Sequence, residues 1–172
     1  AKAQGLYEVI GAAVDDKYIA ELKKQVKNPE LIKEYQKDIK IVYTPLHGTG
    51  NLPARRILKE LGFENVYVVP EQELPNGDFP TVSYPNPEAA EAFELALKLA
   101  KEKDADLVLA TDPDADRVGI AMKCPDGSYE LVSGNEVGVL LLDYICAGRM
   151  EKGTMPENPV AVKSIVSTPL AD

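Results

Sequence analysis

The sequence has few cysteines, no long apolar run and too little positive charge for a nucleic-acid-binding surface. Its two cysteines, Cys124 and Cys146, lie far apart without metal-ligand spacing, which indicates a reducing compartment where thiols stay free. The longest nearly apolar stretches, 137–142 and 107–110, fall well short of the roughly 20 residues that a membrane span needs. With 28 acidic against 19 basic residues the net charge is −9, so neither nucleic acid nor a membrane surface is an expected partner. We therefore expect a cytoplasmic protein whose partner is a small molecule or a metal ion.

The 172 residues, 45% of them apolar, are enough for one sizeable core or two small ones. The sequence starts without a methionine and stops after a strand-like run, and we interpret it as a fragment of a longer protein. Residues 1–38 carry helical periodicity, with Asp15 and Asp16 as caps of a first helix and a second helix beginning at Asn28. We assign them to a helical connector or cover from the preceding domain.

Residues 39–130 alternate strand and helix patterns with short links, which predicts parallel βαβ units with right-handed crossovers. A turn at 125–127 between two strand patterns predicts a hairpin at the end of this domain. The expected fold class is therefore α/β, with a mixed, mainly parallel sheet, helices on both faces and a terminal hairpin. The expected strands are 39–43, 66–69, 106–110, 118–122 and 129–132, and the expected helices are 51–61 and 86–103, the second capped by Asn86 with Pro87 at its first position.

Residues 131–172 look like the incomplete start of another α/β domain. Ser133 and Glu136 form the S-x-x-E pattern of a capping box, which predicts the start of a helix. A linker rich in Gly, Pro and acids follows at 152–158, and 159–166 is predicted to be a strand.

The most informative feature is the aspartate cluster, Asp112, Asp114 and Asp116, which follows the buried strand expected at 106–110. Open α/β sheets bind ligands at that end of their strands. Carboxylates about 5 Å apart repel by about 3 kcal/mol at an effective dielectric near 20. A hard cation such as Mg²⁺ offsets this repulsion, and the adjacent Arg117 suits a phosphoryl group beside a metal. The alternative is a solvated acidic turn in which each carboxylate faces water or caps a backbone N–H.

Two other classes of protein have loops with aspartates at this spacing. An EF-hand loop needs Gly and Glu where this sequence has Arg117 and Lys123, which excludes it. A haloacid-dehalogenase-like phosphotransferase would use Asp112 as its nucleophile. That class expects Thr or Val at the position of Asp116 and a later acidic pair that this sequence lacks, so it stays a weaker alternative.

The histidine loop, residues 45–50, joins a strand end to a helix start, where backbone N–H groups attract anions. Gly48 and Gly50 match the first half of a dinucleotide fingerprint, but the third small residue would fall at Pro53. Glu71 stands where a ribose-binding acid would be, so a Rossmann-type nucleotide-binding module stays a further alternative.

His47 is the only histidine of the sequence. Its place on a loop at the ligand-binding edge predicts a catalytic role, as a substrate contact or a proton shuttle. The alternative is a ring whose hydrogen bonds shape the glycine turn. Metal ligation by His47 is not expected, because no second histidine or paired cysteine accompanies it.

Three motifs in order carry a family resemblance: T-P-L-H-G-T-G at 44–50, P-N-P-E at 85–88 and T-D-P-D-A-D-R-V-G at 111–119. Together they resemble the second domain of the α-D-phosphohexomutases, in particular the phosphoglucomutase/phosphomannomutase branch, followed by the start of the third domain. The resemblance implies a cytoplasmic, Mg²⁺-dependent enzyme. Such enzymes interconvert the 1- and 6-phosphates of hexoses through a phosphoserine and a bisphosphate intermediate.

The resemblance assigns the aspartate cluster to the metal-binding positions of the family's D-G-D-G-D-R loop, and Arg117 to the arginine beside the phosphoserine. Pro113 and Ala115 replace the usual glycines, which changes loop stiffness but no ligand atom. The family's phosphoserine, sugar-recognition and phosphate-binding loops are absent from these 172 residues. The resemblance therefore implies that the chain alone is inactive, that a phosphosugar binds only with the rest of the enzyme, and that the choice of hexose is decided elsewhere. Exposed domain-interface surface would favour dimerisation of such a fragment.

Overall fold

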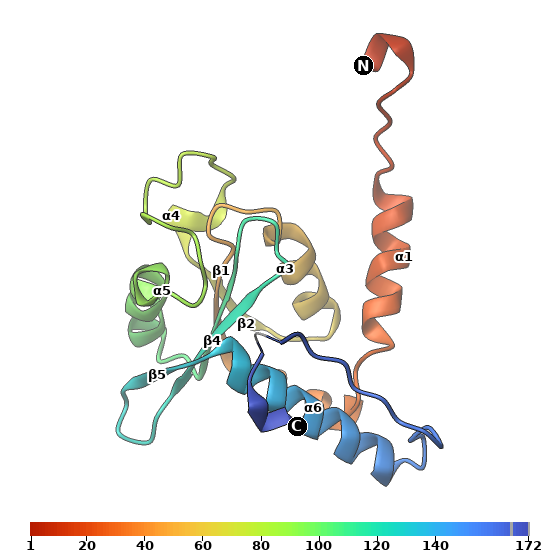
Figure 1. The fold of residues 1–172 in the computed structure, drawn as a ribbon. Helices are drawn as coiled ribbons and strands as arrows, with labels where there is room; N and C mark the ends of the chain where they lie inside the picture. The colour runs from red at the N-terminus through yellow and green to blue at the C-terminus, as the bar shows by residue number, and fades with distance from the viewer. Residues whose placement is uncertain (166, 172) are drawn as a thin grey trace.

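The computed structural model describes residues 1–165 and 167–171, and its centre is one five-stranded sheet (Figure 1). The strands are β1 (Lys40–Thr44), β2 (Asn65–Val68), β3 (Leu107–Thr111), β4 (Val118–Lys123) and β5 (Tyr129–Val132). They lie side by side in the order β2, β1, β3, β4, β5. β1 pairs in parallel with β2 and with β3, whereas β4 pairs antiparallel with β3 and with β5. The predicted mixed, mainly parallel sheet with a terminal hairpin is thus confirmed.

Helices cover both faces of this sheet, as predicted. α3 (Asn51–Glu60) leads from β1 to β2, and α5 (Ala90–Lys103) leads from β2 past β1 to β3. Figure 1 shows the two helices on opposite sides of the sheet. The carboxyl ends of β1 and β3 therefore meet where the strand order reverses, the place where open α/β sheets bind ligands. A short helix that the sequence did not predict, α4 (Pro70–Glu73), follows β2.

The main core lies between the sheet and α5. Val42, Val108 and Ala121 of the sheet are fully buried against Phe93 of the helix. α5 brings alanines to the sheet at four-residue spacing, which repeats one face of a helix and allows a close approach. These alanines are Ala96 and Ala100; Ala92, one turn earlier, packs with Leu46 and Val82 instead, and all three alanines are fully buried.

The predicted start of α5 at Asn86 and Pro87 is wrong, because the helix begins at Ala90. The Asn86 side chain does accept a hydrogen bond from a following amide, Glu88 N, at 3.1 Å, but this bond closes a turn outside the helix. Pro87 is buried, and its carbonyl oxygen lies where a Cβ on Gly119 would approach to 2.1 Å. The chain thus packs its Pro87 backbone against β4 before it turns again into the helix.

The N-terminal segment is helical, with the 3-10 turn η1 (Lys2–Gln4), α1 (Ala12–Lys23) and α2 (Pro29–Tyr35). α1 begins after Gly11, so the prediction that Asp15 and Asp16 cap it is wrong; Asp15 lies within its first turn. α1 packs on α3, where Ile19 is buried and Asp16 pairs with Arg56. The second helix begins after Asn28, as predicted.

α6 (Gly134–Glu151) opens with the predicted capping box. Ser133 Oγ accepts a hydrogen bond from Glu136 N at 3.3 Å, and Glu136 Oε2 accepts one from Ser133 N at 2.8 Å. The strand predicted at 159–166 is wrong for 159–165, which have no regular structure; Val166 lies outside the described residues. Val160 and Val162 are exposed there, and no described strand lies beside them to accept their backbone hydrogen bonds.

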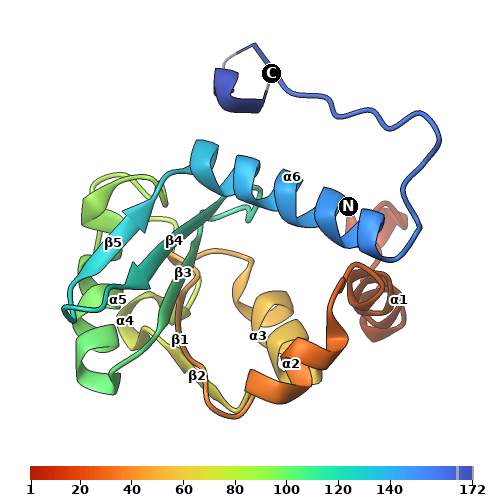
Figure 2. The same cartoon turned by 90° about the horizontal axis from the view of Figure 1, so that it is seen from below.

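The chain ends in a second 3-10 turn, η2 (Pro169–Ala171). Figure 2 shows α6 passing along one side of the molecule, with the C-terminal segment looping back above it. Within the described ranges, none of the helices has the length and apolar character needed to cross a bilayer.

Candidate metal centre

Two loops leave the same edge of the sheet side by side. β1 and β3 are parallel neighbours with Thr44 opposite Ala110, so the segments that follow them begin at the same height. These segments are the histidine loop after β1 and the aspartate loop, residues 112–117, after β3. The fold therefore brings two of the three motifs from the sequence together at the ligand-binding edge.

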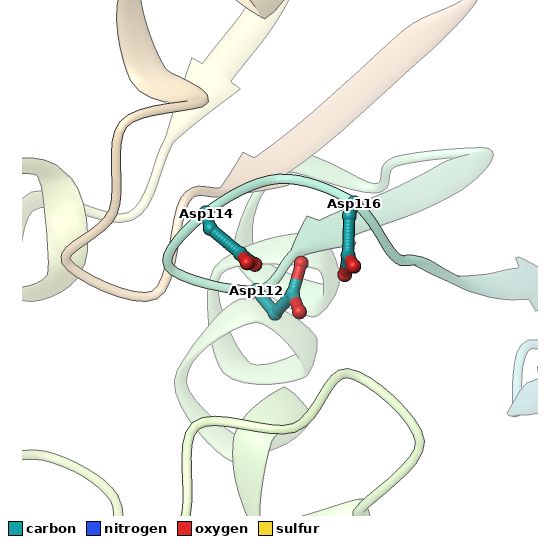
Figure 3. A group of neighbouring side chains, drawn as sticks. All are labelled: Asp112, Asp114 and Asp116. Atoms are coloured by element: carbon teal, nitrogen blue, oxygen red, sulfur yellow. The ribbon is translucent and has the colours of Figure 1, made fainter.

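The aspartate cluster converges, as its spacing predicts. Each of its three side chains offers an oxygen atom, and these three atoms lie within 4.8 Å of one another. Figure 3 shows the three carboxylates pointing into a common space beside the loop. Asp112 is buried, whereas Asp114 and Asp116 are exposed, so the cluster has one inner carboxylate and two outer ones that face solvent.

Backbone contacts hold Asp112 in place. Its Oδ1 accepts a hydrogen bond from Arg117 N at 3.0 Å, and its carbonyl oxygen accepts one from Ala115 N at 3.0 Å. The turn between them puts Ala115 in the left-handed region, at φ 61°. Glycine, which lacks a Cβ, adopts this conformation most easily, so an alanine at this position carries backbone strain.

Arg117 supplies the positive charge next to the cluster. Its Nε lies 3.8 Å from Asp112 Oδ2 and 3.9 Å from Asp116 Oδ1, and its side chain is about half exposed. At these distances the guanidinium forms loose ion pairs with both carboxylates, and its half-exposed side chain can also be reached by an anion from solvent. One guanidinium does not balance three carboxylates, and the site keeps a surplus of negative charge.

The donor set fits a hard divalent cation. Carboxylate oxygens are the ligands that Mg²⁺ and Ca²⁺ prefer. Two oxygens on opposite sides of one Mg²⁺ are about 4.2 Å apart and two adjacent ones about 3 Å, so side-chain rotations must bring the three oxygens, now within 4.8 Å of one another, closer together. The hydrogen bond from Arg117 N to Asp112 is also a feature of the acidic-turn alternative, so the geometry is compatible with both interpretations.

The two loops are packed directly on each other. A Cβ on Gly48 would lie 2.4 Å from Pro113 Cα, and Thr49 N donates a hydrogen bond to Pro113 O at 2.8 Å. A Cβ on Gly50 would lie 2.7 Å from Thr111 Oγ1. The glycines of the histidine loop thus make room for the protein's own backbone and side chains, which weakens the dinucleotide-binding alternative.

His47 is buried inside the histidine loop, with 5% of its surface exposed. Its Nδ1 lies 3.1 Å from Leu74 O and its Nε2 lies 2.9 Å from Thr81 Oγ1, so both ring nitrogens have partners within the protein. Leu46 and His47 have φ values of 46° and 61°, so the loop bends through two consecutive left-handed residues. These contacts favour the alternative in which His47 shapes the turn, and its catalytic role stays a prediction.

Gln72 and Thr81 contact the histidine loop although no motif in the sequence marks them. They belong to the segment 70–84, which follows β2. Gln72 is 1% exposed, and its side chain joins Thr44 to Thr81. No local spacing in the sequence points to these contacts; the polar Thr44 at the end of an apolar strand is the one visible sign of a buried polar partner.

Fold and site together define an α/β domain with a cluster of three carboxylates at its strand ends. The family model for phosphoglucomutase/phosphomannomutase, alpha/beta/alpha domain II, matches residues 16–127. The chain therefore belongs to the phosphoglucomutase/phosphomannomutase family.

Curated relatives agree with this assignment. A Haemophilus influenzae protein named a probable phosphomannomutase is 41% identical over 139 residues, which are 81% of this chain and 27% of that protein. A phosphoglucomutase from Staphylococcus saprophyticus is 42% identical over 136 residues, which are 78% of this chain and 24% of that protein. The chain thus spans about a quarter of the length of these relatives.

A solved structure supports the fold. A phosphoglucomutase/phosphomannomutase family protein from Burkholderia thailandensis superimposes with a TM-score of 0.59 at 24% identity, covering 78% of this chain and 26% of that chain. At that identity the similarity shows the α/β fold alone.

Proposed function

We propose that this chain supplies the metal-binding segment of a cytoplasmic phosphohexomutase, an intramolecular phosphotransferase. Such an enzyme interconverts hexose 1-phosphate and hexose 6-phosphate through a phosphoserine and a bisphosphate intermediate. The observation that carries the proposal is the convergence of three carboxylates at the strand ends of a domain II fold.

In this proposal Asp112, Asp114 and Asp116 hold Mg²⁺. Bound there, the ion would neutralise negative charge on a phosphoryl group during its transfer. Asp112 is held ready by the hydrogen bond from Arg117 N, so the inner ligand needs little reorganisation. The half-exposed Arg117 guanidinium binds phosphoryl oxygens next to the metal. Such a contact promotes phosphoryl transfer, because this reaction depends mainly on positioning and on neutralising charge.

The role of His47 is narrower than the sequence suggested. A proton shuttle would have to release Nε2 from Thr81 and bring a buried ring to the surface. We therefore assign His47 to holding the histidine loop against the aspartate loop rather than to proton transfer.

A Mg²⁺ titration followed by calorimetry tests the metal site. We expect binding with a dissociation constant on the order of 1 mM, as for solvent-facing carboxylate sites. Asp114→Asn should weaken binding at least about tenfold, because it removes one of three anionic ligands. Asp143→Asn, an exposed aspartate on α6, is the matched control and should leave the titration unchanged. An unchanged titration in Asp114→Asn would favour the acidic turn instead.

The aspartyl-nucleophile alternative makes a different prediction. It requires a phosphoryl group or a beryllofluoride adduct on Asp112, which intact-mass measurement would detect. We expect no such adduct, because the sequence lacks the later acidic pair that this class of phosphotransferase uses. The Rossmann-type alternative predicts a thermal shift with NAD that depends on Glu71, and we expect none.

The purified chain is expected to show no conversion of glucose 1-phosphate. The residues that would form the phosphoserine and bind the sugar are not among these 172. The substrate is therefore proposed as a hexose phosphate without a choice among glucose, mannose and glucosamine. Measurable turnover by the purified chain would contradict the proposal that catalysis requires residues outside these 172.

A further inference from the structure

A line of buried polar side chains connects β1 to the histidine loop. Thr44 Oγ1 donates a hydrogen bond to Gln72 Oε1 at 2.7 Å, and Gln72 Nε2 donates one to Thr81 Oγ1 at 3.1 Å. Thr81 Oγ1 lies 2.9 Å from His47 Nε2, and His47 Nδ1 lies 3.1 Å from Leu74 O. Thr44 is fully buried, Gln72 is 1% exposed and His47 is 5% exposed. Buried polar groups at such a site must be satisfied by one another.

Donor and acceptor chemistry determines the direction of each hydrogen bond in this line of side chains. A carbonyl oxygen only accepts hydrogen bonds, so the contact with Leu74 O requires a proton on His47 Nδ1. The Thr81 hydroxyl accepts from Gln72 and has one proton to give, which goes to His47 Nε2 as acceptor. A neutral ring with the proton on Nδ1 is thus the form in which every group of the line has a partner.

The backbone of His47 is tied to the same segment. His47 N donates to Gln72 O at 2.9 Å, and His47 O accepts from Asn76 N at 3.3 Å. The loop conformation it holds is strained, because Leu46 and His47 both have positive φ. Such strain persists only where surrounding contacts compensate for it.

The next two residues carry the constraint to the metal centre. Gly48 packs against Pro113, and Thr49 donates to Pro113 O from both its backbone N, at 2.8 Å, and its Oγ1, at 3.1 Å. Pro113 lies between Asp112 and Asp114. The position of the aspartate loop thus depends on a contact only two residues away from the clamped histidine.

We propose that Gln72 and Thr81 are positioning residues that hold His47 as its neutral Nδ1–H tautomer and thereby fix the histidine loop against the aspartate loop. The consequence for Mg²⁺ affinity rests on the proposed function; the tautomer and the loop contact do not.

The single histidine makes the tautomer directly measurable. A long-range ¹H–¹⁵N NMR spectrum of the chain at pH 8, where an ordinary histidine is neutral, should show the pattern of a protonated Nδ1 and a hydrogen-bonded, unprotonated Nε2. In Thr81→Val the Nε2 signal should move to the position of a free imine nitrogen. Thr81→Ser keeps the hydroxyl and should restore the wild-type position. A protonated Nε2 in the wild type, or an Nε2 signal that does not move in Thr81→Val, would overturn the proposal.

Amide hydrogen exchange tests the connection between the loops. We expect exchange of the Thr49 amide to quicken about tenfold in Thr81→Val, as after loss of a buried hydrogen bond, and not in Thr81→Ser. Amides of β3 should keep their rates in both variants, which separates a local release from general destabilisation. Thr154→Val, the same substitution in the turn after α6, is the control and should change neither region. Equal rates for Thr49 in Thr81→Val and wild type would contradict the proposed positioning role.

The Mg²⁺ titration of the same variants separates the two proposals. Weaker binding in Thr81→Val with rescue in Thr81→Ser supports both. If the wild type binds no Mg²⁺, the proposed function fails, whereas the NMR and exchange results still decide whether Gln72 and Thr81 position the histidine loop. If Thr81→Val does not fold, Thr81→Ser still tests the proposal. The proposal requires Thr81→Ser to keep the wild-type tautomer and the wild-type exchange rates.

Discussion

Gly48 lies so close to Pro113 that a Cβ at position 48 would be 2.4 Å from Pro113 Cα. The contact joins two loops that are far apart along the chain, and hydrogen bonds to Pro113 O from Thr49, 64 residues before it, reinforce the contact. One loop carries the only histidine and the other carries the aspartate cluster. The glycine at position 48 is therefore required by packing between loops rather than by its own backbone angle.

Gly48→Ala should be strongly destabilising. The added methyl group meets backbone atoms of Pro113, which cannot rotate away, so one of the two loops must move. We expect a loss of about 2–4 kcal/mol in the free energy of unfolding, measured in urea. Gly77→Ala is the matched control, because nothing lies within 4 Å of its Cβ position, and it should change stability by less than about 0.5 kcal/mol. Equal effects of the two substitutions would show that the loop contact is not tight.

Ala115→Gly should stabilise the aspartate loop. Ala115 has φ 61° in the turn closed by its hydrogen bond to Asp112 O, and glycine adopts this angle without the cost imposed by a Cβ. After the greater unfolded-state entropy of glycine is subtracted, a gain of about 0.5–1 kcal/mol in unfolding free energy is expected. Ala105→Gly, at a buried position without positive φ, should instead destabilise the chain. A loss of stability in Ala115→Gly would mean that the turn differs from the one described.

Tyr43→Phe should lower stability at neutral pH by about 1 kcal/mol, because it removes the hydrogen bond between Tyr43 Oη and Thr111 Oγ1. Burial raises the pKa of Tyr43 above its ordinary value of 10.0, with the Thr111 hydrogen bond acting in the opposite direction. A raised pKa in the folded state means that the contribution of Tyr43 is complete below pH 10 and is lost as the pH rises through the folded-state value. The stability gap between wild type and Tyr43→Phe, measured in urea at pH 7, 9 and 10.5, should therefore narrow above pH 10. A gap of constant size would rule out the linkage.

Short sequence patterns predicted most of the strands and helices, because these elements are determined mainly by residues close to one another in the sequence. The strands of the sheet follow from apolar runs and the hairpin from its turn, and the capping box at Ser133 and Glu136 marks the start of α6. The predicted start of α5 was wrong because Asn86 and Pro87 match a capping pattern. The contact that overrides this pattern is made by Gly119 on β4, which is distant in the sequence. The segment 159–165 has strand-like composition, but a strand forms only beside a partner, which no local pattern supplies.

The candidate site divides in the same way. The alternate spacing of Asp112, Asp114 and Asp116 showed that the three carboxylates can turn inward together, since they belong to one short loop, but it did not exclude a solvated turn. The hydrogen bonds of His47 to Leu74 and Thr81 come from a segment about 30 residues away and depend on how two loops fold together. Sequence reasoning could therefore place the histidine at the ligand-binding edge but could not decide between a catalytic and a supporting role.

Mg²⁺ should stabilise the chain through the aspartate cluster. If the dissociation constant is about 1 mM, 10 mM Mg²⁺ raises the unfolding free energy by about 1.4 kcal/mol through preferential binding to the folded state. The expected observation is an upward shift of the thermal midpoint that EDTA reverses. A chain with net charge −9 is also stabilised by screening alone, so the reference is NaCl at equal ionic strength, and only the excess over that reference counts. Asp116→Asn should remove most of the excess because it deletes a ligand, whereas Asp143→Asn should retain it. An excess that persists in Asp116→Asn would show that Mg²⁺ acts on the acidic surface as a whole, and the cluster would then be an acidic turn rather than a metal centre.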